Sequence, residues 1–290
     1  MPDTSLNLNR LFSRGLLYLV LLTFAAYFLM PLLVMLFASF KDLSEIRAGN
    51  LVMPPLDPTL EPWRKAWSEA CTGIECNGIK GYFWNSFVIT IPAVILSSAI
   101  GAINGYVLSK WRFKGSELFF FCLLVGCFIP FQAVLLPMAQ TLGWMGISNS
   151  VVGLILVHTI YGIPFTTLFY RNYYVGLPTE LISAAKLDGA GFFTTFWRIV
   201  LPLSGPIIVV TLIWQFTNIW NDFLFGVIYS GPDSKPVTVA LNNLVNTSTG
   251  VKEYNVDMAA AIIAALPTII VYVVSGKYFL RGLMAGAVKG

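Results

Sequence analysis

Polar side chains recur along one face of an apolar run in the last third of the chain. Gln215, Asn218 and Asp222 lie at positions i, i+3 and i+7, which share one side of a helix, and Trp220 and Asn221 are next to them. Amides and a carboxylate beside aromatic rings suit a sugar, because rings stack on its apolar face and polar groups hold its hydroxyls. The competing interpretation is that the amides join neighbouring helices and that Asp222 lies at the outer water boundary.

The sequence contains none of the common catalytic or nucleotide-binding motifs. No Gly-x-x-x-x-Gly-Lys-Ser/Thr loop, Gly-x-Ser-x-Gly turn or His-Glu-x-x-His helix occurs. The one histidine, His158, lies in an apolar run, which favours neutral helix packing over lining a pathway. Cys71 and Cys76 lie in a polar loop without the further ligands that zinc needs, so they either form a small disulfide or stay free. We therefore expect no enzyme activity, no catalytic residue and no metal site.

A polar segment at 172–202, between two apolar runs, has the pattern of two short helices. Glu180 lies near the start of the first helix, and Gly189 permits the left-handed conformation in which a helix ends. Ala184 and Ala185 form a face small enough for another backbone to approach closely. The second helix carries an apolar stripe at Phe192, Phe196, Ile199 and Val200. The segment is amphipathic where its neighbours are wholly apolar, which predicts a docking element.

The spacing in this segment resembles the cytoplasmic coupling loop of ABC-importer permeases. In that family the loop commonly begins Glu-Ala-Ala, and Ser183 stands here in place of the glutamate, so the role of that carboxylate does not transfer. The stretch from Asp188 to Ala190 and the last stretch, Lys277 to Gly290, resemble more narrowly the second permease of maltose-type carbohydrate importers. The residues that match or flank the loop are Glu180, Ser183, Ala184, Ala185, Asp188, Gly189, Ala190, Ile199, Leu201 and Pro202.

This resemblance implies a transmembrane permease subunit of an ATP-driven importer that translocates a mono- or oligosaccharide, for instance a glucose-like one. It implies as partners a homologous second permease, two ATP-binding subunits and an extracytoplasmic solute-binding protein. ATP and magnesium would be held by the ATP-binding subunits, so we expect this chain to bind no cofactor. The alternatives are an ABC permease for another small solute and an ion-coupled secondary transporter, for which Asp222 is the only intramembrane carboxylate.

Composition excludes a soluble globular protein. The chain is 57% hydrophobic and 11% charged, whereas soluble domains carry about 25% charged residues. The apolar run at 118–170 would be about 80 Å long as one helix, against a hydrocarbon core of about 30 Å, so it must form two passes. We expect an all-α integral membrane protein, embedded in lipid, with a short outer helix at Glu61–Cys71. Its six spans are predicted at Gly15–Phe40, Gly81–Ser109, Leu118–Met138, Val151–Tyr170, Leu203–Ile228 and Met258–Gly276.

The distribution of positive charge predicts the orientation of these spans. Eleven of the 18 lysines and arginines lie on the side that holds both termini and the 172–202 loop, and cytoplasmic loops are the ones enriched in such residues. The net charge of +4 thus reflects topology, and no nucleic-acid partner is expected. The predicted organisation is a cytoplasmic N-terminus at 1–14, a six-span domain at 15–281 and a cytoplasmic tail at 282–290 that either contacts the ATPases or frays. The membrane would be the cytoplasmic (inner) membrane of a bacterium or archaeon.

Overall fold

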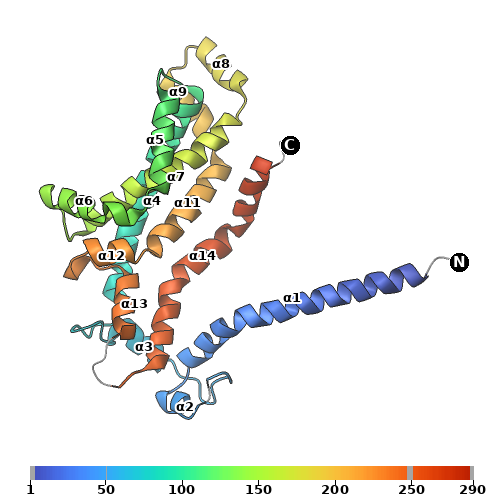
Figure 1. Cartoon of the computed structure of the whole chain (residues 1–290), viewed down its shortest axis with the longest axis vertical. Helices are drawn as coiled ribbons and strands as arrows, with labels where there is room; N and C mark the ends of the chain where they lie inside the picture. Colours follow the sequence, from blue (N-terminus) through green and yellow to red (C-terminus); the bar gives the residue numbers. More distant parts are fainter. Residues whose placement is uncertain (1–3, 50, 247–250, 288–290) are drawn as a thin grey trace. The chain divides into compact units, whose positions relative to one another are not determined.

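The computed structural model describes residues 4–49, 51–246 and 251–287, and all regular structure in these ranges is helical. Figure 1 shows the helices in chain order. They are α1 (Thr4–Ser39), α2 (Leu43–Arg47), α3 (Glu61–Ser68), α4 (Lys80–Lys110), α5 (Ser116–Phe128), α6 (Phe131–Trp144), α7 (Val151–Val175), α8 (Thr179–Leu187), α9 (Phe192–Thr195), a π-helix (Phe196–Val200), α10 (Leu201–Leu203), α11 (Gly205–Trp220), α12 (Leu224–Tyr229), a 3-10 turn (Pro232–Ser234), α13 (Val237–Asn246) and α14 (Tyr254–Ala287).

The chain divides into two compact units. Unit 1 comprises Met1–Ile79 and Leu244–Ile263, and unit 2 comprises Lys80–Asn243 and Ala264–Gly290. The all-helical class expected from the sequence is confirmed. Four helices are long and apolar enough to cross a membrane, or up to six if each of two bent helix pairs counts as one span.

In unit 1, the loop after α1 is tied to the first turns of α14. The ammonium group of Lys41 is fully buried and donates a hydrogen bond to the Met53 carbonyl at 2.6 Å. Asn255 donates to the Lys41 carbonyl at 3.0 Å, and Lys65 forms an ion pair with Glu253 at 2.6 Å. These bonds fix a small polar structure around α3, which lies within the predicted outer helix. The structure also joins Cys71 and Cys76 by a disulfide.

In unit 2, α4 and α7 pack closely along one another. Two glycines of α4 allow this approach: a side chain at Gly101 would overlap Thr166, and one at Gly105 would overlap Tyr170. The Ser98 and Tyr170 hydroxyls share a hydrogen bond of 2.8 Å across the same interface. This helix pair, with α11 against it, is the frame that positions both features described below.

The third predicted span, Leu118–Met138, is not one straight helix. Two helices cover it, and α5 and α6 meet at an angle of 102°. Pro130 causes the break, because it precedes α6 with an extended backbone and disfavours a helical conformation at Ile129 before it. The uniform hydropathy of the run hides this break. Alone, the 13 residues of α5 reach about 20 Å, less than a hydrocarbon core.

The fifth predicted span, Leu203–Ile228, is also divided. Its helix α11 ends at Trp220, and α12 begins after a turn whose Asp222 carboxylate accepts a hydrogen bond from the Gly226 N–H at 3.1 Å. At its other end, α11 meets the preceding helical stretch at an angle of 79°. The sixth span lies within α14, which continues to Ala287, while residues 288–290 of the predicted tail lie outside the described residues.

Candidate docking segment and aromatic pocket

The 172–202 segment folds as two short helical stretches joined by a glycine turn, as the sequence predicts. Helix α8 begins after Pro178, and Gly189 follows it with φ +77°, in the left-handed region. Gly191 differs: it has an extended backbone and precedes α9. The second stretch runs from α9 through a π-helical turn into α10. We call Leu177–Pro202 the docking segment.

Aromatic side chains anchor the docking segment to the ends of α4 and α7. Phe196 is 2% exposed, and its ring lies 5.5 Å from the ring of Tyr106 in α4. Lys110, the last residue of α4, donates to the Leu177 carbonyl at 2.6 Å, and the Lys186 ammonium lies 4.4 Å above the Trp111 ring. The buried cluster comprises Ala102, Tyr106, Tyr170, Tyr174, Ile182, Phe196 and Val200. A displacement of the segment would therefore be transmitted directly to two long helices.

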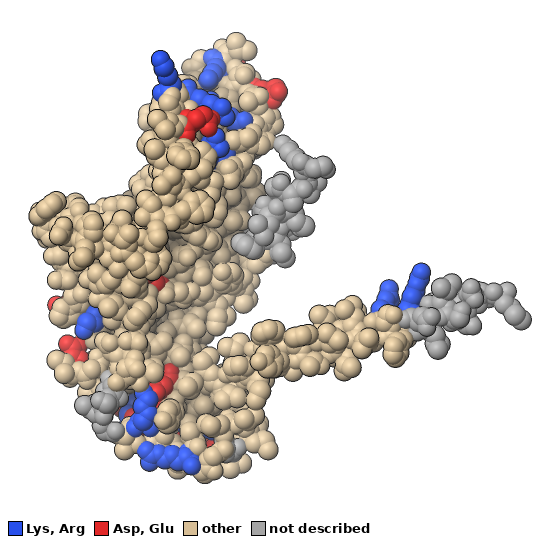
Figure 2. All heavy atoms as spheres, viewed as in Figure 1, with Lys and Arg blue, Asp and Glu red and all other residues tan. Residues whose placement is uncertain are grey.

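The opposite face of the docking segment is exposed. On α8, Ile182 and Ala185 face inward. Large apolar side chains stand on the outside, with Leu187 90% and Phe193 68% exposed. Figure 2 shows Lys and Arg side chains, with some Asp and Glu among them, gathered at the end of unit 2 that holds α8 and α9, beside an uncharged stretch. Of the loop residues singled out by the sequence, Glu180, Ser183, Ala184, Asp188, Gly189 and Pro202 are exposed, Ala190, Ile199 and Leu201 are half-buried, and Ala185 is buried.

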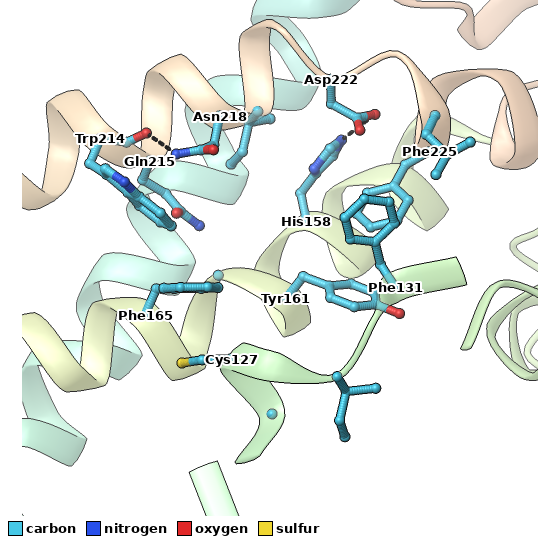
Figure 3. A pocket seen from close by; sticks show the side chains of 15 residues that line it. Cys127, Phe131, His158, Tyr161, Phe165, Trp214, Gln215, Asn218, Asp222 and Phe225 are labelled. Atoms are coloured by element: carbon cyan, nitrogen blue, oxygen red, sulfur yellow. Dashed lines mark hydrogen bonds and ion pairs between the residues drawn. The ribbon is translucent and has the colours of Figure 1, made fainter. Parts of the chain in front are cut away.

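A pocket of about 320 Å³ lies farther along unit 2, between the break of α5 and α6, helix α7, helix α11 and the start of α12. Figure 3 shows aromatic side chains on both of its sides: Trp214 with Phe165 on one, and Phe225, Phe131 and Tyr161 on the other. We call it the aromatic pocket. A cavity lined by rings with a few polar groups is the usual form of a small-molecule site.

The polar groups of the aromatic pocket come from α7, α11 and the turn that follows α11. His158 is 7% exposed, and its Nε2 lies 3.9 Å from Asp222 Oδ2 (Figure 3). Asn218 donates to the Trp214 carbonyl at 2.8 Å, and buried Gln215 donates to the Ser97 hydroxyl at 3.0 Å. The carboxylate and the imidazole therefore face one another at a distance too long for a direct hydrogen bond.

The structure brings three of the five predicted pathway residues together. Gln215, Asn218 and Asp222 line the aromatic pocket, but Trp220 and Asn221 do not. Trp220 is buried on another side of α11, where its Nε1–H donates to the Ala264 carbonyl at 2.9 Å. Asn221 is exposed, and its side-chain oxygen lies 3.5 Å from the Thr268 hydroxyl. The three residues at helical spacing therefore line one pocket, and the two residues adjacent to them in sequence lie elsewhere.

Sequence reasoning missed most of the opposite wall. His158, Tyr161 and Phe165 of α7 line the pocket and lie at i, i+3 and i+7, the same spacing as the polar face of α11. That repeated spacing was the available signal, although aromatic residues at helical spacing are common in packed helices. Within the described ranges, no cluster of three His, Cys, Asp or Glu side chains is arranged to hold a metal ion.

Comparisons with known proteins agree with this geometry. Residues 93–283 match the family model described as the binding-protein-dependent transport system inner membrane component. A probable ABC transporter permease protein of Pyrococcus horikoshii is 40% identical over 96% of this chain and 98% of its own length. The xylose/arabinose import permease protein XacI of Haloferax volcanii is 31% identical over 93% and 92%. The crystal structure of a bacterial ABC transporter that imports alginate contains a chain with TM-score 0.80 and 21% identity, over 96% of this chain and 99% of that one.

Proposed function

The chain belongs to the family of binding-protein-dependent transport system inner membrane components, and from that premise we propose that it is a sugar-translocating permease subunit. It is a multi-pass inner membrane protein and a component of an ABC importer, distinct from the ATPase subunits. An importer of this kind works with ATPase and binding-protein partners. The proposal adds the solute, the docking site and the composition of the complex.

The docking segment is the observation that supports the proposed mechanism. It presents Leu187 and Phe193 to a partner on one face and is anchored through Phe196 on the other. In the proposed complex, one of two ATP-binding subunits grips the exposed face, and a homologous second permease completes the pathway. ATP-driven closure of the ATPase pair moves the docking segment and shifts the permease between two states.

The charge distribution supports a cytoplasmic location for the docking segment. Lys110, Arg112 and Lys114 form a basic turn after α4, and Arg171 and Lys186 lie in and beside the segment. Positive loops face the cytoplasm, where ATP is available. Both termini are on this same side in the proposed topology, and the loop that contains α3 is outside.

Two observations favour a sugar as the solute: the sugar named for a relative, and the chemistry of the residues that line the aromatic pocket. XacI is named a xylose/arabinose import permease. In this chain, the aromatic pocket combines ring faces with amide, imidazole and carboxylate groups and contains no lysine or arginine among its described lining residues. Such a lining suits a neutral polyol better than phosphate or another anion.

The test is purification and reconstitution of the tagged chain from its native membrane. We expect a second permease and an ATPase to co-purify, and the complex with its binding protein to accumulate radiolabelled xylose, arabinose or glucose when ATP is supplied. Activity of the chain alone in liposomes under an ion gradient would instead identify a secondary transporter. Accumulation of only a non-sugar solute would retain the importer and overturn the sugar assignment.

A further inference from the structure

We propose that the aromatic pocket is a binding site of this subunit for one sugar ring, so that this chain contacts the solute directly during translocation. This inference rests on the proposed function, and it adds a place and a set of contacts. It assigns α7 and α11 as the binding walls, with Trp214 and Tyr161 as the aromatic contacts and His158, Asn218 and Asp222 as the polar ones.

The aromatic walls are held rigidly. The ring of Trp214 lies 4.8 Å from that of Phe165 and 5.2 Å from that of Phe169. On the other side, the ring of Tyr161 lies 4.8 Å from that of Phe225. Rings fixed in this way offer flat apolar faces at little cost in side-chain entropy, which is what the C–H face of a pyranose or pentose needs.

One hydroxyl group can bridge His158 and Asp222 from the side that faces the pocket. Their nearest atoms are 3.9 Å apart, so a hydroxyl beside the pair can reach both, donating to the carboxylate and accepting from an imidazole N–H. Asp222 is already positioned by its hydrogen bond from Gly226. A sugar hydroxyl is both donor and acceptor, whereas an apolar solute or a simple cation satisfies only part of this arrangement.

The amide of Asn218 supports the same conclusion. Asn218 uses one amide hydrogen on the Trp214 carbonyl, which leaves its second hydrogen and its oxygen for a ligand.

The helix-packing explanation applies to a different amide. Gln215 is 2% exposed, and its side-chain amide donates a hydrogen bond to Ser97 of α4. Gln215 is therefore the amide that joins two helices. Asn218 is exposed, and Asp222 accepts a hydrogen bond from Gly226 of α12. Neither joins α11 to α7, although both line the space between these helices.

The size of the pocket restricts the ligand. A volume of about 320 Å³ is at the lower end of the range of about 300–1,000 Å³ for small-molecule sites. The pocket therefore accommodates a single ring. A longer saccharide would occupy it with one ring at a time as it passes.

The experiment uses the complete complex with its binding protein, reconstituted in liposomes and supplied with ATP. Initial rates of radiolabelled xylose, arabinose and glucose uptake are measured for Asp222→Asn and Asn218→Ala. We expect uptake at sub-saturating sugar to fall roughly tenfold for Asp222→Asn and roughly 2- to 10-fold for Asn218→Ala, as expected for the loss of single hydrogen bonds. Direct binding of the same sugars to the nucleotide-free complex should weaken in the same order.

The matched control is Asn221→Ala, because Asn221 is an exposed amide directly after α11 and lies outside the pocket. Its uptake should equal that of the unmodified complex. Asp222→Asn guards against misfolding, since it keeps the size of the side chain and an oxygen that can accept from Gly226. Uptake and binding by both variants at unmodified levels would overturn the inference and leave the proposed function intact. Failure of the unmodified complex to take up any sugar would overturn both.

Discussion

The Lys110 ammonium donates a hydrogen bond of 2.6 Å to the carbonyl of Leu177, so that the last residue of α4 holds the first residue of the docking segment. Gly105, one turn earlier in α4, brings α4 against α7. The docking segment is thus attached both by the chain that continues from α7 and by a charged bond from α4. Movement at the proposed ATPase contact can therefore reach the long helices by the chain and by this bond, in addition to the aromatic cluster around Phe196.

Replacing Lys110 with methionine tests the contribution of this bond. The variant keeps most of the aliphatic chain but loses a hydrogen bond from a charged group, a class worth about 1.5–3 kcal/mol. We expect ATP-driven uptake to fall while assembly with the ATPase persists. Lys114→Met is the control, because Lys114 is an exposed residue of the same basic turn. Equal uptake by the two variants would contradict the role of the Lys110 bond.

Gly189→Val should abolish ATP-driven uptake and leave membrane insertion intact. The φ of +77° at this position costs a residue with a side chain about 1–2 kcal/mol, and more for a β-branched one, so α8 and α9 must reorient. Gly191→Ala is the control, since its backbone is extended and a side chain there meets open space. Insertion is measured by membrane fractionation and transport by solute uptake. Normal uptake by Gly189→Val would argue against docking through this turn.

Two neighbouring phenylalanines should give opposite results. Phe196→Ala removes a buried ring from the cluster around Tyr106, a type of change that costs about 3–5 kcal/mol, and should lower the thermal stability of the purified permease. Phe193→Ala removes an exposed ring, so it should leave the stability unchanged and weaken binding of the ATPase. Thermal melting and ATPase pull-down on both variants separate the anchoring face from the docking face. Loss of stability in both would show that the two faces are not distinct.

The proposed orientation predicts where thiols can be labelled. A cysteine at Leu187, which is 90% exposed, should react with a membrane-impermeant maleimide only when the cytoplasmic side is accessible. Cys71 and Cys76 should react from outside, and only after reduction of their disulfide. Intact and inverted vesicles provide the two accessibilities. Labelling of Leu187→Cys from outside would invert the topology and exclude the proposed docking to an ATPase.

The sequence allowed the docking segment to be predicted in detail because local chemistry determines it. Gly189 ends a helix, and the apolar stripe that includes Phe196 and Val200 gives the buried face. The bends between helices were harder to predict from the sequence. The bend at Pro130 lies in a run of uniform hydropathy, and the end of α11 at Trp220 is followed by further apolar residues, so composition indicates neither break.

The sequence indicates only one side of the aromatic pocket, because the two sides belong to separate segments. The polar face of α11 follows from helical spacing within one segment. Its partner residues, His158 and Tyr161, belong to α7, and nothing local indicates that these two faces meet. Proximity in sequence places Trp220 in the predicted pathway. A buried indole N–H needs a hydrogen-bond acceptor, however, and that of Trp220 donates to the Ala264 carbonyl, away from the pocket.

Asp222 combines two contacts on one carboxylate: it accepts from the first turn of α12 and it faces His158. A carboxylate has about four acceptor positions, so an arriving hydroxyl can add to the bond from Gly226 without displacing it. In the proposed site, the carboxylate is therefore held in its binding position before a sugar enters. Little free energy is then lost to rearrangement when a sugar enters the pocket.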